Sequence, residues 1–152
     1  MPLSRRTVLL AAAATPLTVS LASLARAGVA PVYAERGVAI DGSDAVAYFK
    51  VGAPTTGSKD IIFDWNGAQW RFSSEKNKAA FAANPQAYAP QYGGYCAWAV
   101  SEGYTASTVP DAWKIVNGKL YLNYSSRIQR RWERDIPGRI ARGDANWPGL
   151  VA

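Results

Sequence analysis

Hydrophobic and polar residues alternate in two parts of the chain, and each alternating run is interrupted by an Asn-Gly pair. Alternation with a period of two indicates strands with one buried face, and Asn-Gly is the preferred dipeptide of tight hairpin turns. The sequence therefore predicts two antiparallel β-hairpins: residues 61–72 around Asn66-Gly67 and residues 113–124 around Asn117-Gly118. In the first hairpin, the positions that alternate onto one face of each strand are Ile61, Phe63 and Trp65, then Ala68, Trp70 and Phe72.

Each predicted hairpin leads into a Ser-Ser pair, and serine is a favoured residue at a helix N-terminus. Ser73-Ser74 predicts a helix through Ala83, which Asn84-Pro85 ends before a further turn to Tyr88. Ser125-Ser126 predicts a second helix. The apolar side of this second helix holds Ile128, Trp132 and Ile136, Pro137 breaks or kinks it, and Ile140 continues the apolar face.

The remaining segments are shorter and carry weaker patterns. We expect residues 29–42 to be a lead-in on the domain surface, residues 45–49 a brief strand or turn, and residues 52–60 a loop. Residues 92–100 are apolar and rich in small side chains, which favours a short buried helix or turn carrying Cys96. The predicted fold is a small single α+β domain: two antiparallel hairpins with short helices packed on one side.

The first 27 residues have the pattern of an export signal. Arg5 and Arg6 lie in a segment similar to the twin-arginine motif, and an apolar, alanine-rich stretch over residues 8–24 follows. Ala25-Arg26-Ala27 offers the small-x-small pattern that a signal peptidase cuts. The alternatives are general secretion and an uncleaved membrane anchor, for which the stretch is barely long enough. We expect a twin-arginine-type signal peptide at residues 1–27, export to the periplasm by the twin-arginine machinery, and no stable membrane span after cleavage.

Composition restricts the chemistry that one chain can perform. There is no histidine and one cysteine, Cys96, so neither a Cys–His nucleophile nor a Cys/His zinc cluster can form within the chain. The formal net charge of +6 includes the arginines of the leader. The most basic stretch, residues 127–142, is interleaved with Glu133 and Asp135, and Asp144 follows it. We therefore expect a solvated helix face there and no nucleic-acid partner.

Several segments resemble the YHS domain family. Residues 41–49 (DGSDAVAYF) are similar to the opening of a YHS domain, and residues 70–88 (with WRFSSEKN and FAANP) are similar to its second half. Residues 92–97 (YGGYCA) and residues 112–124 resemble the extension found in a larger exported branch. The resemblance covers about residues 38–147 and implies a YHS-like domain at residues 28–152 with a C-terminal helical extension.

In metal-binding YHS proteins, cysteines hold the metal, and the resemblance places their positions at Ala47, Ser73 and Asn77. This chain therefore resembles the scaffold without its usual ligands. Cys96 is the remaining sulfur ligand, and a copper ion or another soft metal there would need a homodimer, an envelope partner or an external ligand. The alternatives for Cys96 are a redox-active or nucleophilic thiol, with Lys114 as the cation that lowers its pKa, and a small buried hydrophobe.

Other side chains are candidates for a ligand pocket. The full candidate set is Asp44, Tyr48, Tyr95, Cys96, Trp98, Trp113 and Lys114. For Asp44, a pairing with Asp41 competes with local turn or cap hydrogen bonds, which we favour. Gly93-Gly94 could approach a ligand or form a tight turn, and the turn is favoured. The aromatic side chains are equally typical of a core.

No phosphate loop, nucleophile elbow or nucleotide fingerprint is present in the sequence, so we assign no catalytic residue. We expect an exported binding protein with a link to metal handling. The alternatives are a thiol-dependent redox protein or enzyme using Cys96, and a structural or interaction module in which Cys96 is inert.

Overall fold

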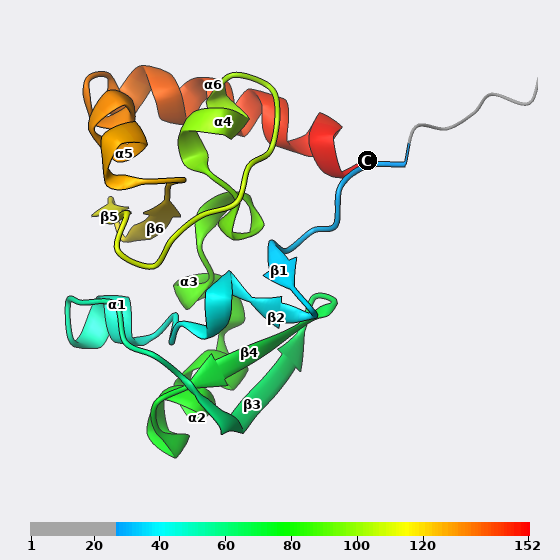
Figure 1. Ribbon diagram of the computed structural model, residues 1–152, viewed down its shortest axis with the longest axis vertical. Coiled ribbons are helices and arrows are strands. Elements are labelled where there is room, and N and C mark those ends of the chain that lie inside the picture. Colours follow the sequence, from blue (N-terminus) through cyan, green and yellow to red (C-terminus); the bar gives the residue numbers. More distant parts are fainter. Residues whose placement is uncertain (1–26) are drawn as a thin grey trace, which may run out of the picture.

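The computed structural model describes residues 27–152, so the predicted signal peptide lies outside the described residues except for Ala27. The domain is α+β: a mixed four-stranded sheet lies at one end and a two-stranded hairpin towards the other (Figure 1). The strands are β1 (Ala34–Glu35), β2 (Val38–Ala39), β3 (Ser58–Trp65), β4 (Ala68–Phe72), β5 (Trp113–Val116) and β6 (Lys119–Leu122). The α-helices are α1 (Ala47–Lys50), α2 (Glu75–Ala83), α3 (Pro85–Tyr88), α4 (Ala97–Ser101), α5 (Ser126–Glu133) and α6 (Ile136–Val151).

Both predicted hairpins are confirmed, as β3–β4 and β5–β6. In the first turn, Asn66 and Gly67 have φ angles of 51° and 82°, and in the second, Asn117 and Gly118 have φ angles of 51° and 75°. A two-residue turn of type I′ requires positive φ at both residues, which Asn and Gly adopt at the least cost. The turn chemistry therefore determines where each hairpin reverses.

The serine caps are also confirmed. Ser74 Oγ accepts a hydrogen bond from the backbone N–H of Asn77 at 3.1 Å, at the start of α2. Ser125 Oγ accepts one from the N–H of Ile128 at 3.2 Å, at the start of α5. The hairpin–serine–helix arrangement thus occurs twice in the chain.

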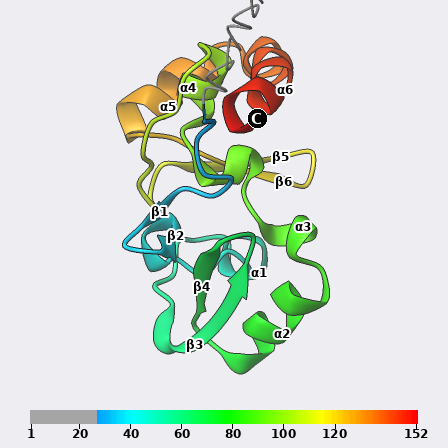
Figure 2. The same cartoon turned by 90° about the vertical axis from the view of Figure 1, so that its right-hand side faces the viewer.

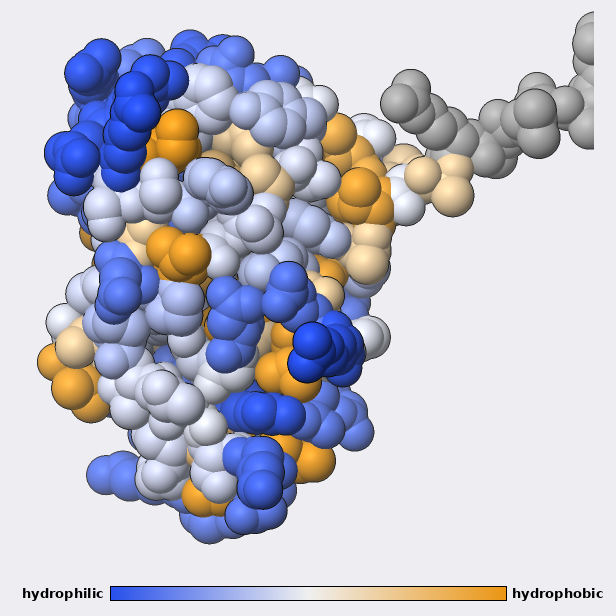
Figure 3. Space-filling view, in the orientation of Figure 1, coloured by the Kyte–Doolittle hydropathy of each residue, from blue (hydrophilic) through white to orange (hydrophobic). Residues whose placement is uncertain are grey.

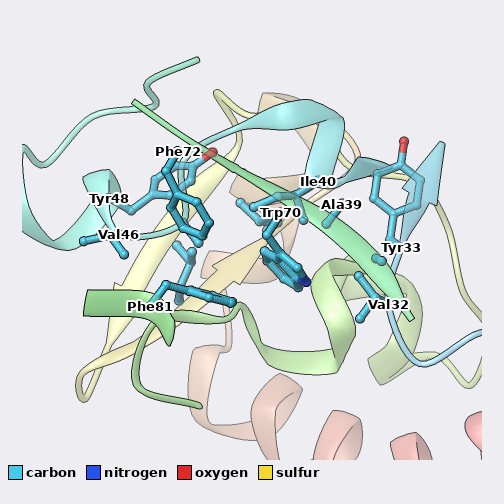
Figure 4. Packing of buried hydrophobic residues seen from close by; sticks show 13 residues of the cluster. Val32, Tyr33, Ala39, Ile40, Val46, Tyr48, Trp70, Phe72 and Phe81 are labelled. Atoms are coloured by element: carbon cyan, nitrogen blue, oxygen red, sulfur yellow. The ribbon is translucent and has the colours of Figure 1, made fainter. Parts of the chain in front are cut away.

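The prediction of a surface lead-in over residues 29–42 was wrong. Strands β1 and β2 pair with each other, and Val38 of β2 pairs in parallel with Gln69 of β4, which gives the sheet order β1-β2-β4-β3. Val32 and Ile40 are at most 4% exposed, inside the core shown in Figure 4. Strands of two residues are too short to show an alternation of hydrophobic and polar residues, so the sequence does not indicate that β1 and β2 are strands.

Two other predictions concern helices. Residues 45–46 form the expected turn, but the segment continues from Ala47 as the helix α1. The predicted break of the second helix near Pro137 is confirmed: α5 ends at Glu133, and α6 begins anew with Pro137 in its first turn. Proline fits there because a backbone N–H at that position would have no helical partner, and proline lacks one. The side chain of Asp135 caps α6 by accepting the N–H of Gly138 at 3.1 Å. None of the helices within residues 27–152 is both long and apolar enough to cross a bilayer.

The buried side chains form two clusters, one at each end of the domain. The first surrounds Trp70, Phe72 and Phe81 beneath the four-stranded sheet, with α2 and α3 on one side (Figure 2, Figure 4). The second surrounds Tyr121 and Trp132, where α4, α5 and α6 cover the β5–β6 hairpin. The boundary between these clusters is where a cleft can form.

Candidate functional site

Asp44 is the centre of a buried polar cluster. Its side chain is 0% exposed, and Oδ1 accepts the backbone N–H groups of Val46 at 2.9 Å and Ala47 at 3.2 Å, which begins α1. Oδ2 accepts three hydrogen bonds: from the backbone N–H of Ser73 at 2.8 Å, from the hydroxyl of Ser73 at 2.6 Å, and from the Nδ2 amide group of Asn77 at 2.8 Å. Burying a carboxylate is costly unless it is fully hydrogen-bonded, and these donors meet that requirement. Asp44 therefore ties α1 to the β4–α2 junction, and its predicted turn-and-cap role is confirmed.

The three positions that the YHS resemblance matches to cysteines meet at this carboxylate. Ala47, Ser73 and Asn77 each donate a hydrogen bond to Asp44, although they come from α1, the end of β4 and α2. A backbone amide, a hydroxyl and a carboxamide are not soft-metal ligands, so these residues do not fit a copper centre. Among residues 27–152, no three His, Cys, Asp or Glu side chains gather closely enough to hold a metal ion.

Cys96 lies just before α4 and is 1% exposed. Its Sγ is 3.6 Å from Oδ1 of Asn123 and accepts the backbone N–H of Tyr124 at 3.3 Å. Burial raises the pKa of the Cys96 thiol, against the opposing effect of the nearby backbone N–H groups. Lys114, the activating cation of the reactive-thiol alternative, forms an ion pair with Glu133 at 3.3 Å. The thiol is thus held neutral and out of solvent, which opposes both nucleophilic and metal-binding roles.

The other predicted pocket residues are dispersed. Tyr48 donates to the carbonyl of Pro110 at 2.9 Å, its ring lies 5.3 Å from that of Trp113, and burial raises its pKa to about 12. Tyr95 lies against Trp147 with ring centroids 5.8 Å apart. The backbone N–H of Trp98 donates to Asn123 Oδ1, the same oxygen that faces Cys96. The structure therefore forms local groups from the candidate set but does not gather it around one pocket.

A cleft of about 430 Å³ lies where the two clusters meet, and none of the seven predicted pocket residues lines it. Its walls come from the segment before β1, the β3–β4 turn, the α3 region, β6 and α6. The aromatic lining consists of Trp65, Trp70, Tyr92 and Trp147, and the polar lining consists of Asn66, Gln86, Gln91, Lys119 and Asp144. Residues from so many segments share no local spacing, so sequence reasoning had no signal for this site.

The floor of the cleft is held by the tight turn at Tyr92 and Gly93, whose φ angles are 57° and 61°. The carbonyl of Gly93 accepts the N–H of Tyr33 at 2.9 Å, and a Cβ at Gly93 would collide with the carbonyl of Pro31. Tyr92 Oη–H donates to Asp144 Oδ1 at 2.9 Å, and burial raises the pKa of Tyr92. The prediction of a tight turn at Gly93-Gly94 is confirmed, and the turn anchors α6 to the cleft.

Comparison of the chain with known protein families, curated proteins and solved structures found no match.

Proposed function

We propose that the protein is an exported, YHS-like binding protein in which a hydrogen-bonded carboxylate occupies the place of the metal cluster, and whose ligand binds in the cleft. The convergence of Ala47, Ser73 and Asn77 on Asp44 supports the YHS resemblance. Ala47 lies more than 25 residues before Ser73 and Asn77, and a shared cluster at these three positions is what a metal site in the relatives would require. The same convergence argues against metal handling as the role of this chain, because every group there is already hydrogen-bonded.

The observation that carries the binding proposal is the cleft itself. Its volume of about 430 Å³ falls within the range of roughly 300–1,000 Å³ that small-molecule sites occupy. Aromatic surface with a few polar groups is the usual lining of such sites, and both are present here. The turn at Tyr92 and Gly93, in which Tyr92 has a positive φ, fixes the floor of the cleft, which favours a preformed site.

The lining favours a neutral ring that carries hydroxyl groups, such as a saccharide. Trp65 and Trp147 are half-buried, so part of each indole remains free to contact the C–H face of a sugar ring. The amides of Asn66 and Gln86 are exposed and supply both donors and acceptors for hydroxyl groups. Lys119 and Asp144 contribute opposite charges to the lining, so the site does not select a charged ligand.

The thiol-dependent alternative has weaker support, because Cys96 is buried and its pKa is raised. Competition for Cu(I) against a chromogenic chelator, with wild type and Cys96→Ser, tests the metal role directly. We expect the two proteins to compete equally. Stronger competition by the wild type would assign Cys96 a metal-binding role and remove this part of the proposal.

Isothermal titration with glucose, N-acetylglucosamine and maltose tests the cleft. We expect at least one sugar to bind with a Kd of about 1 mM or tighter, and Trp147→Ala to weaken it at least about tenfold. Trp98→Ala is the matched control, since Trp98 is also half-buried but lies outside the cleft. Urea midpoints establish that both variants are folded. Absence of binding by the wild type, or equal losses in the two variants, contradicts the proposal.

A further inference from the structure

Four arginines form a continuous stripe on the exposed side of α5 and at the residue that caps its end: Arg127, Arg130, Arg131 and Arg134. Their spacing of i, i+3, i+4 and i+7 places them within about 100° of arc on a helix with 3.6 residues per turn. All four are exposed, whereas Trp132 on the opposite side of the helix is 0% exposed. In Figure 3 the most hydrophilic colour gathers at the upper left, where α5 lies.

The acidic residues interleaved with this stretch form no ion pair with the stripe. Glu133 pairs with Lys114 at 3.3 Å. The hydrogen bond from Gln129 and the charges of Lys114 and Arg130 lower the pKa of Glu133, so of the stripe only Arg130 interacts with this carboxylate, at longer range. Asp135 caps α6 and pairs with Arg142 at 3.8 Å, and Asp144 accepts the hydroxyl of Tyr92. Each carboxylate is therefore engaged by a group outside the stripe.

The four guanidinium groups of the stripe have no ion-pair partner within residues 27–152, and residues 1–26 contain no acidic side chain. The other two arginines of this region do have partners, since Arg139 pairs with Glu102 and Arg142 with Asp135. Four guanidinium groups without an ion pair on two helical turns are an electrostatic footprint for a partner that carries negative charge.

We infer that the arginine stripe docks the protein on the surface of a membrane that contains anionic phospholipids. None of the four arginines lines the cleft between the two clusters or the two further hollows at the β3–β4 turn and the end of α6, which favours a plane of phosphates over an inserted peptide. Its length of about 10 Å is short for a track along a nucleic acid. Tyr124, just before α5, is 56% exposed, and tyrosine is enriched at membrane–water interfaces.

Co-sedimentation with phosphatidylglycerol–phosphatidylcholine vesicles, and with phosphatidylcholine vesicles alone, tests the inference. Each protein is purified from cells as it accumulates there, and all variants are compared with the same N-terminus. The stripe variant replaces Arg127, Arg130, Arg131 and Arg134 by Gln. The control variant removes the same charge elsewhere, with Gln at the exposed positions Arg36, Lys50, Lys59 and Lys76.

We expect the wild type to bind the anionic vesicles, to bind phosphatidylcholine weakly, and to lose binding as salt is raised. The stripe variant should bind at least about 100-fold more weakly, because each arginine near an anionic surface contributes about a fivefold factor. The control variant should stay within about threefold of the wild type, and a fourfold Arg→Lys variant should retain most of the binding.

Two results would overturn the inference. One is equal vesicle binding by the stripe variant and the control variant. The other is stripe-dependent binding to duplex DNA or to polyglutamate that exceeds vesicle binding at the same ionic strength, which would assign the surface to a different class of partner.

Discussion

Replacing Asp44 by Asn tests whether the Asp44 carboxylate holds α1 to the β4–α2 junction. The substitution keeps the shape of the side chain but leaves only one oxygen to accept hydrogen bonds. In its best orientation the amide oxygen faces Ser73 and Asn77, and its NH₂ group then opposes the backbone N–H groups of Val46 and Ala47.

The size of the effect follows from the number of donors left without an acceptor. One buried N–H group, that of Val46, loses its acceptor, at a cost of about 1–3 kcal/mol. The N–H of Ala47 keeps the backbone carbonyl of Asp44 as an acceptor at 3.2 Å. The Asp44→Asn substitution should therefore lower the free energy of unfolding by about 2 kcal/mol, a sizeable part of the roughly 5–15 kcal/mol that stabilises a typical domain. With a urea m-value of about 2 kcal/mol/M, the unfolding midpoint should fall by about 1 M.

Urea unfolding followed by tryptophan fluorescence measures this shift. Asp41→Asn is the matched control, because Asp41 is exposed and accepts only the hydroxyl of Tyr33 at 3.1 Å. We expect that variant to stay within about 0.5 kcal/mol of the wild type. If Asp44→Asn shifts the midpoint no more than Asp41→Asn does, then the carboxylate does not hold these elements together and the reasoning is refuted.

Three further predictions follow from the same contacts. Gly93→Ala should destabilise the fold by at least about 2 kcal/mol, because the added Cβ would collide with the Pro31 carbonyl. Gly118→Ala should cost about 1 kcal/mol, because the space around Gly118 is open. Equal urea midpoints for the two variants would contradict this prediction. The Cys96 thiol should react with a disulfide reagent far more slowly in the native protein than in urea, and fast native labelling near neutral pH would show that it is accessible. Tyr48 holds its proton to a pKa of about 12 against an ordinary 10.0, so its stabilisation is complete below pH 10 and is lost between pH 10 and 12. Tyr48→Phe should therefore show a shallower loss of stability across that range, and an unchanged slope would exclude Tyr48 as a contributor.

Local chemistry made the hairpins and helix starts predictable. Asn66-Gly67 and Asn117-Gly118 adopt positive φ at both residues, which a type I′ turn requires and few other dipeptides allow. Each turn could therefore be located from two residues. The caps at Ser74 and Ser125 are likewise decided within four residues. These elements were found because the interactions that specify them are short in sequence.

The missed features depend on contacts between distant segments. The parallel pairing of β2 with β4 rests on one pair of residues, and α1 begins because Asp44 is held by Ser73 and Asn77 from elsewhere in the chain. The cleft needs Trp65 of the first cluster and Trp147 of the second to line the same hollow, and α6 extends well beyond the predicted apolar face. Contacts between distant segments produce no periodic pattern of hydrophobic residues along the chain, so the sequence does not predict them.

The most direct test of the binding cleft is an NMR titration that follows the indole N–H resonances as a sugar is added. The six tryptophans divide evenly: Trp65, Trp70 and Trp147 line the cleft, and Trp98, Trp113 and Trp132 do not. We predict saturable shifts for the first three and unchanged resonances for the others. Shifts confined to the second group, or no shift at any sugar concentration, would contradict the proposal that this cleft is the binding site.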